Sequence, residues 1–202
     1  MSGWKNKLYY GDNLDVLRKH VRDESVDLVY IDPPFNSKRN YNQIYNSIGS
    51  EDRAQAQAFT DTWMWDNRAN EGYHQIIANN EGRFPPQSVE LIKGLVGVLK
   101  KESLLAYLVS MTLRIAEIHR VLKQTGTFYL HCDPTASHYL KLVLDSVFVA
   151  RGGNFRNEIV WCYRGGGVPR KDFARKHDVI FRYTKTSGDD YTFNLDEVRV
   201  SY

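Results

Sequence analysis

The sequence predicts an α/β fold that closes with two antiparallel strands. Three observations support it: an apolar run that stops at two prolines, two long stretches with helical spacing that precede a second apolar run, and two late stretches rich in β-formers. In chain order these are residues 28–31, then 87–101 and 103–123 followed by 127–132, and finally 157–163 with 178–184. Prolines directly after the first run end that strand and leave a stiff turn, so we expect it to be short and buried on both faces.

Composition places the chain among ordinary globular proteins. It has 202 residues, of which 42% are hydrophobic and 25% charged, and its formal net charge is +3. That charge is compatible with a nucleic-acid partner but is too small to argue for one. Its two cysteines, Cys132 and Cys162, fall in expected strands and are interpreted as buried reduced thiols. We find no signal-peptide pattern and no run of about 20 apolar residues, so we expect a cytoplasmic protein without a membrane partner.

In the first third of the chain, the sequence pattern predicts a strand, a helix and a long loop. Residues 7–10 are expected to form a short strand, and Asp12 suits the cap of the helix that follows. Residues 36–86 are polar and rich in aromatic residues, and we expect a long loop insertion there. Two interpretations of its aromatic residues stay open. Trp63 and Trp65 either pin the loop to the core or belong to a lid with stacking rings.

The turn Asp32-Pro33-Pro34-Phe35 is the strongest candidate for chemistry. It follows the carboxyl end of a strand, which is where open α/β sheets bind ligands. The Asp32 carboxylate and the Pro33 carbonyl are two acceptors for the two hydrogens of an exocyclic amine on a nucleobase. Such an amine is a poor nucleophile, and positioning of this kind would aim its lone pair at an electrophile. Phe35 offers a flat face to a base that has left the duplex.

These residues resemble a known family in combination with three further segments. Asp32-Pro33-Pro34-Phe35 is similar to motif IV of the amino-group DNA methyltransferases, above all the adenine-specific beta class and the modification subunits of type III restriction systems. The segments that fit the same family are Tyr10-Gly11-Asp12-Asn13-Leu14, Ser25-Val26-Asp27-Leu28, and Phe128-Tyr129-Leu130-His131-Cys132-Asp133-Pro134. The resemblance covers nearly the whole chain.

The resemblance implies a partial Rossmann-like fold of the S-adenosylmethionine-dependent methyltransferases, ending in an antiparallel β-hairpin. It implies that residues 1–202 are the catalytic, N-terminal part of a DNA methyltransferase domain that methylates adenine N6, within a restriction-modification system. Asp32, Pro33, Pro34 and Phe35 are then catalytic, and Asp12 and Asp32 contact the cofactor. N4-cytosine methylation and an inactive, truncated DNA-binding remnant are the alternatives.

Double-stranded DNA is the partner that this resemblance implies. The connection 164–177 holds three consecutive glycines and several basic residues, and we expect this basic hairpin tip to contact the DNA backbone. Solvated surface charges are the alternative for these residues. The expected DNA contacts are Lys38, Arg39, Arg164, Arg170, Lys171, Arg175 and Lys176.

Two expectations concern absences. We expect no metal site at His131 and Cys132, because neighbouring residues of a strand point to opposite faces. The glycine-rich strand–turn–helix that cradles the methionine part of the cofactor does not occur in the sequence. In the beta class that motif lies further towards the C-terminus. A fragment, one part of a split enzyme and a truncated gene are therefore alternatives, and a C-terminal half or a restriction subunit is an implied partner.

Overall fold

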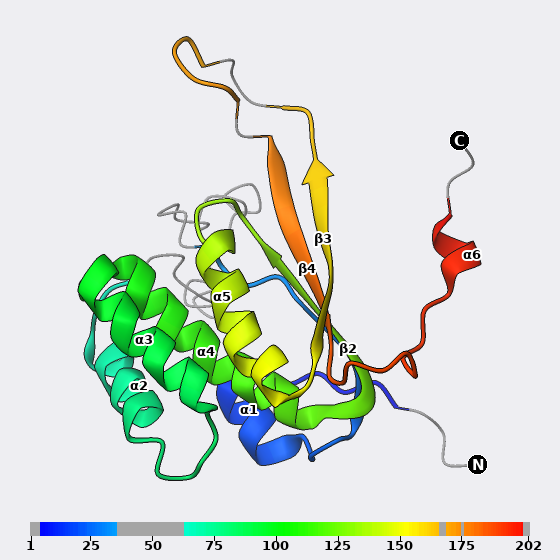
Figure 1. The fold of residues 1–202 in the computed structure, drawn as a ribbon, viewed down its shortest axis with the longest axis horizontal. Helices are drawn as coiled ribbons and strands as arrows, with labels where there is room; N and C mark the ends of the chain where they lie inside the picture. The colour runs from blue at the N-terminus through cyan, green and yellow to red at the C-terminus, as the bar shows by residue number, and fades with distance from the viewer. Residues whose placement is uncertain (1–4, 36–62, 166–168, 175, 200–202) are drawn as a thin grey trace, which may run out of the picture.

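The computed structural model describes residues 5–35, 63–165, 169–174 and 176–199, and within these ranges it has a mixed α/β fold (Figure 1). The strands are β1 (Val26–Ile31), β2 (Leu122–Cys132), β3 (Asn154–Cys162) and β4 (His177–Thr184). The α-helices are α1 (Asn13–His20), α2 (Asn67–Ala78), α3 (Pro86–Leu99), α4 (Ser103–Val121), α5 (Ser137–Val147) and α6 (Leu195–Val198), and the 3₁₀ helix η2 covers Val149–Arg151.

The four strands in the described residues form one mixed sheet with the order β1-β2-β4-β3. β1 pairs in parallel with β2, with Leu28 opposite Thr127 and Ile31 opposite Leu130. β2 and β3 each pair antiparallel with β4. The carboxyl ends of β1 and β2 therefore lie at the same edge of the sheet as the amino end of β4. Three strands that are far apart in the sequence bring side chains together at that edge.

Helices α1 to α5 pack on one face of the sheet, where the hydrophobic core lies, whereas α6 lies apart from them (Figure 1). Phe128 and Leu130 of β2 and Phe181 of β4 are buried there. The ring of Phe128 stacks on that of Phe148, just after α5, with centroids 5.5 Å apart and planes at 6°. The predicted helices 87–101 and 103–123 are confirmed as α3 and α4, whose apolar residues supply much of this core.

The opposite face of the sheet carries exposed apolar side chains. Leu28 and Tyr30 of β1 are 54% and 52% exposed, and Ile159 and Trp161 of β3 are exposed as well. The expectation that the first apolar run is buried on both faces is therefore wrong. Only Val29 and Ile31, which point to the helical side, pack against the core. β1 is also an edge strand of the described sheet, since β2 is its only neighbour there.

The expectation of one loop over residues 36–86 is corrected, because α2 lies within that stretch. The side chain of Asp66 caps the helix by accepting a hydrogen bond from the Ala69 N–H at 2.9 Å. A Cβ atom at Gly72 would lie 3.0 Å from the side chains of Val109 and Leu113, so α2 and α4 approach closely at this glycine. Residues 36–62 lie outside the described residues.

Both tryptophans before α2 contact the helical layer. The Trp63 ring lies 5.4 Å from that of Tyr107 in α4, and the Trp65 ring lies 5.9 Å from that of Tyr73 in α2. The Lys101 ammonium lies over the Trp65 ring at 5.3 Å. These contacts favour the interpretation in which the tryptophans anchor this segment to the core.

The strand expected at residues 7–10 does not form. Residues 5–10 have no regular secondary structure, and Leu8 is 99% exposed. A strand needs a partner for its backbone groups, and this segment pairs with no described strand. Tyr9 instead stacks on His20 of α1 with ring centroids 5.4 Å apart. The predicted cap is confirmed, since Asp12 Oδ1 accepts from the Leu14 N–H at 2.8 Å.

Two junctions define the ends of β2. Gly126 lies inside this strand, because α4 runs directly into it. A Cβ atom there would meet the Lys123 carbonyl oxygen at 2.8 Å, which explains the glycine. After β2, Asp133 Oδ1 accepts from the backbone N–H of Thr135 and of Ala136, and α5 starts at Ser137.

The two cysteines have different environments. Cys132 is buried, and burial raises the pKa of its thiol, followed by the nearby Asp133 carboxylate. Cys162, at the end of β3, is exposed, so the interpretation of two buried thiols is wrong for this residue. In the described part of the chain, no helix is both long enough and apolar enough to cross a membrane.

Candidate active site

The turn Asp32-Pro33-Pro34-Phe35 leaves the carboxyl end of β1 at the edge of the sheet. Pro33 and Pro34 lack a backbone N–H and cannot continue the ladder, so the strand ends at Ile31. The Asp32 side chain is 58% exposed, and both prolines and Phe35 are half-buried. The turn therefore presents one accessible carboxylate, a backbone carbonyl at Pro33 and one aromatic ring at the end of a rigid strand.

His131 of β2 lies beside this turn and contacts it in two ways. Its Nδ1 is 3.3 Å from Asp32 Oδ1 and 3.4 Å from the Tyr30 hydroxyl. Its ring meets that of Phe35 edge-on, with centroids 5.2 Å apart. The side chain is nearly buried, so a polar ring is held against the accessible carboxylate.

Asp178 of β4 reaches the other nitrogen of the same ring. Its Oδ2 is 3.3 Å from His131 Nε2, and its Oδ1 accepts from the Tyr163 hydroxyl at 3.4 Å. The Trp161 ring of β3 lies 5.6 Å from the imidazole. The four strands therefore each contribute a side chain to one cluster, centred on His131.

Tyr30 remains a hydrogen-bond donor in this cluster. Burial raises the pKa of its hydroxyl, and the nearby Asp32 carboxylate raises it further. Both effects disfavour the phenolate, because a second negative charge would be poorly solvated and close to the first. The hydroxyl therefore keeps its proton and can donate to Asp32 or to the imidazole.

Asp12, the other expected cofactor contact, lies at the start of α1. Besides the Leu14 N–H, its carboxylate faces the Arg114 guanidinium of α4, with Nη2 2.9 Å from Oδ1 and 3.2 Å from Oδ2. Its side chain is 45% exposed. A carboxylate has about four lone-pair sites, so Asp12 keeps some acceptor capacity towards solvent.

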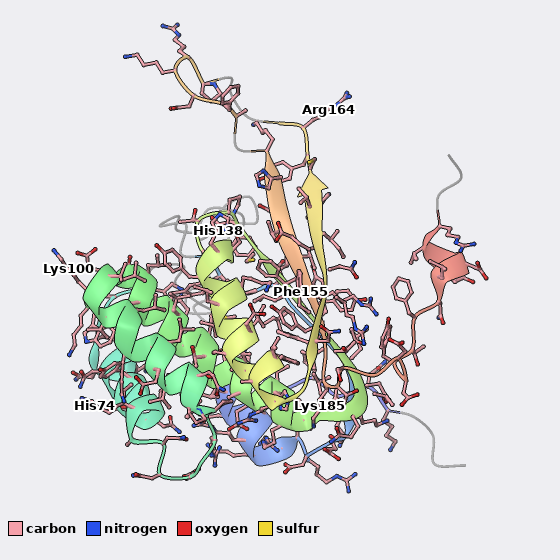
Figure 2. All side chains as sticks on the ribbon, viewed as in Figure 1. His74, Lys100, His138, Phe155, Arg164 and Lys185 are labelled. Atoms are coloured by element: carbon pink, nitrogen blue, oxygen red, sulfur yellow. The ribbon has the colours of Figure 1, made fainter. Side chains whose placement is uncertain are left out.

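The described basic residues of the connection between β3 and β4 lie away from the core. That connection projects beyond the rest of the molecule, and Arg164 marks its start in Figure 2. Arg164, Arg170 and Lys171 are exposed, and none of them forms an ion pair with a residue that the structure describes. Lys176 is half-buried. Of the other expected DNA contacts, Lys38, Arg39 and Arg175 lie outside the described residues.

No metal-ligand cluster is found among the described histidines, cysteines and acidic residues. His131 and Cys132 point to opposite faces of β2, as expected for neighbours in a strand. His131 meets Asp32 and Asp178, whereas the Cys132 Sγ lies in the core, 3.6 Å from the Val179 carbonyl oxygen.

Sequence reasoning found the turn after β1 but not the role of its neighbours. His131 entered only within one segment of the resemblance and as a rejected metal ligand, and Asp178 was not singled out. The signal that could have pointed to them is positional, because both lie at strand ends that meet at one edge of a sheet. Locating that edge requires the register between β2 and β4, in which His131 lies opposite Ile180 and Cys132 opposite Val179.

Comparison with known proteins identifies the family to which the chain belongs. The family model of the DNA methylases, which groups N6 and N4 enzymes, matches residues 26–202. The chain therefore belongs to the DNA methylase family. The mixed sheet is consistent with a methyltransferase-like fold.

Three curated relatives illustrate the range of this family. The chain is 26% identical to the type II methyltransferase M.BglII of Bacillus subtilis over 96% of its own length and 39% of the relative. It is 28% identical to the Mod subunit of the type III restriction-modification enzyme StyLTI of Salmonella typhimurium, over 77% of the chain and 20% of the relative. It is 24% identical to the DNA adenine methyltransferase YhdJ of Escherichia coli, over 96% of the chain and 45% of the relative.

The chain thus spans less than half the length of these relatives.

Proposed function

We propose that the chain carries the catalytic part of a DNA methyltransferase that methylates adenine N6 within a restriction-modification system. The observation that carries the proposal is the turn at the end of β1, where the accessible Asp32 carboxylate and the Pro33 carbonyl stand beside the Phe35 ring. The name of the relative YhdJ, a DNA adenine methyltransferase, supports adenine as the target. N4-cytosine methylation is the second candidate, because the matching family groups N6 and N4 enzymes.

In this proposal the chain's own residues position the amine. Asp32 and the Pro33 carbonyl accept the two amino hydrogens, which favours a pyramidal nitrogen with its lone pair directed at the methyl donor. Phe35 stacks on the base, which must leave the duplex to reach the turn. After methyl transfer the amino nitrogen is positively charged, because it still carries both of its hydrogens and must lose one as a proton. The electron pair of that N–H bond returns to nitrogen as the proton leaves for the Asp32 carboxylate or for water.

Enzymes of this family generally use S-adenosylmethionine, which supplies an electrophilic methyl group. The residues present fit part of such a ligand. The exposed side of the Asp12 carboxylate can accept from its adenosine part, and Asp32 lies at the strand end where transfer takes place. Among the described residues no glycine-rich turn joins a strand to a helix, so we assign no residue to the methionine part.

DNA is the proposed partner, and the exposed Arg164, Arg170 and Lys171 are proposed to contact its phosphates. These three cations form no ion pair with a described residue. On a projecting connection they can attract a polyanion that lies against this end of the sheet. Lys38, Arg39, Arg175 and Lys176 belong to the same proposal. The name of one relative, a Mod subunit, supports a partner subunit as well.

Product analysis tests the reaction directly. The native, full-length protein is incubated with unmethylated DNA and S-adenosylmethionine bearing a labelled methyl group. The DNA is then digested to nucleosides and analysed by mass spectrometry. We expect label in N6-methyl-2′-deoxyadenosine. Label only in N4-methyl-2′-deoxycytidine would establish the second candidate, and the absence of label from every nucleoside would contradict both.

A further inference from the structure

Three oxygen atoms surround the His131 imidazole, whose residue is only 5% exposed. Asp32 Oδ1 and the Tyr30 hydroxyl face Nδ1 at 3.3 Å and 3.4 Å, and Asp178 Oδ2 faces Nε2 at 3.3 Å. The rings of Phe35 and Trp161 pack against the imidazole. These contacts fix the ring on all sides, and one of its neighbours is the carboxylate proposed to meet the substrate.

Counting donors and acceptors distinguishes two states of this cluster. A carboxylate only accepts, so His131 can bond both Asp32 and Asp178 only when both of its ring nitrogens carry a proton. In the neutral ring, Nε2–H still donates to Asp178, but Nδ1 becomes an acceptor. It then accepts from the Tyr30 hydroxyl, and its lone pair faces Asp32 Oδ1. With a proton on Nδ1, His131 therefore attracts Asp32 Oδ1. Without that proton, the Nδ1 lone pair repels it.

We propose that His131 is a positioning residue whose Nδ1–H holds Asp32 Oδ1 and thereby turns Oδ2 towards the target amine. Asp178 fixes the orientation of the ring from the other side. The proposal rests on the proposed function for the identity of the amine. A carboxylate on an exposed turn rotates unless one oxygen is held, and a held carboxylate accepts the amino hydrogen without first being reoriented.

Packing alone does not account for a histidine at this position. The neighbours Phe35 and Trp161 would accommodate an apolar ring, and burying a polar ring costs free energy unless its hydrogen bonds are made. Here the ring nitrogens face the Tyr30 hydroxyl, the Asp32 carboxylate just after β1 and the Asp178 carboxylate of β4. Asp178 itself accepts from the Tyr163 hydroxyl. The arrangement connects the turn after β1 to the far strands of the sheet through a single side chain.

The first test compares His131→Phe with His131→Asn in the full-length protein. Phenylalanine keeps the ring contacts and removes both donors, whereas asparagine places an amide near the position of Nδ1. We expect His131→Phe to lower kcat about 10- to 100-fold with unchanged KM for DNA, and His131→Asn to recover part of that loss. His138→Phe, on the exposed side of α5, is the matched control. Equal kcat for His131→Phe and wild type would overturn the proposal.

A crystal structure of His131→Phe gives a result that does not depend on activity. We expect the Asp32 carboxylate to leave its single orientation, while β1 and β2 keep their register. Thermal unfolding of the variant establishes that it is folded, and His131→Asn serves if it is not. An Asp32 side chain in its original position would overturn the proposal even if the wild-type protein methylates nothing. Loss of methyl transfer in the wild type would instead count only against the proposed function.

Discussion

Asp32 is the residue on which the proposed chemistry depends most, and replacing it separates catalysis from binding. We expect Asp32→Ala to abolish methyl transfer and to leave the affinity for DNA nearly unchanged, because its contact with the amine is made mainly in the transition state. Single-turnover methyl transfer and a DNA-binding titration measure the two effects. Asp27→Ala, at the exposed start of the same strand, is the matched control. Near-normal turnover in Asp32→Ala would show that the turn is not the catalytic motif.

His119 of α4 makes a second residue-scale prediction, which concerns stability. Burial, and then the charge of Arg151, lower the pKa of its imidazole from the ordinary value of 6.5 to about 3. The unfolded chain therefore binds a proton there before the folded protein does. The stability that the neutral ring contributes is fully present above pH 6.5 and is lost as the pH falls from 6.5 towards 3.

Replacing His119 should flatten this dependence. His119→Gln has no titrating group, so its free energy of unfolding should decline less steeply than that of the wild type between pH 6.5 and pH 4. Urea denaturation at a series of pH values measures the difference, and His138→Gln, an exposed histidine, is the control. Parallel curves for the wild type and His119→Gln would mean that the ring titrates alike in both states.

At the scale of elements, the hydrophobic periodicity predicted the helices that have a repeating apolar pattern. It failed for elements whose formation depends on tertiary contacts. The helices at 87–101 and 103–123 were predictable because their apolar residues repeat over several turns. α2 was missed because its first turns are polar, and its main local signal is the cap at Asp66. The expected strand at 7–10 has the right composition but no partner strand among the described residues, and pairing with a partner is what stabilises a strand.

The prediction at the scale of elements concerns the connection between β3 and β4. We expect replacement of Arg164, Arg170 and Lys171 by Gln to weaken DNA binding for all sequences alike. The slope of log K against log salt should fall by about 0.9 for each lost phosphate contact. Binding titrations at several salt concentrations measure it. The same number of charges removed from Arg22, Lys93 and Lys100 is the control, and an unchanged slope in the first variant would mean that the connection is merely solvated.

At the scale of the whole molecule, the site comes from strand register, which the sequence does not reveal. The turn after β1 was predictable because two prolines after an apolar run end a strand whatever the rest of the fold is. Asp32 contacts His131 of β2, which in turn contacts Asp178 of β4, roughly 100 and 150 residues further along the chain than Asp32. Nothing local to His131 or Asp178 distinguishes either of them from a histidine or aspartate that faces solvent. Only the order β1-β2-β4-β3 brings them to one edge.

The prediction at the scale of the whole molecule concerns the side of β1 that has no neighbouring strand in the described sheet. We expect the 202 residues alone to bind S-adenosylmethionine weakly or not at all and to be only marginally stable. β1 has a neighbour on one side only in the described sheet, and Leu28 and Tyr30 face solvent. Calorimetric titration of this chain, repeated after adding a candidate C-terminal half, measures the binding. Tight binding by the 202 residues alone would show that these residues hold the complete cofactor site.

The parallel pairing of β1 with β2 also sets an order of events during synthesis. Leu28 pairs opposite Thr127, so β1 has no partner until about a hundred further residues have been made. At roughly 5–20 residues per second, that delay is about 5–20 s. During this interval the backbone edges of this apolar strand are available to other chains. Asp32 and His131 lie side by side only after β2 has been made and has paired with β1, so the proposed positioning contact between them cannot form earlier.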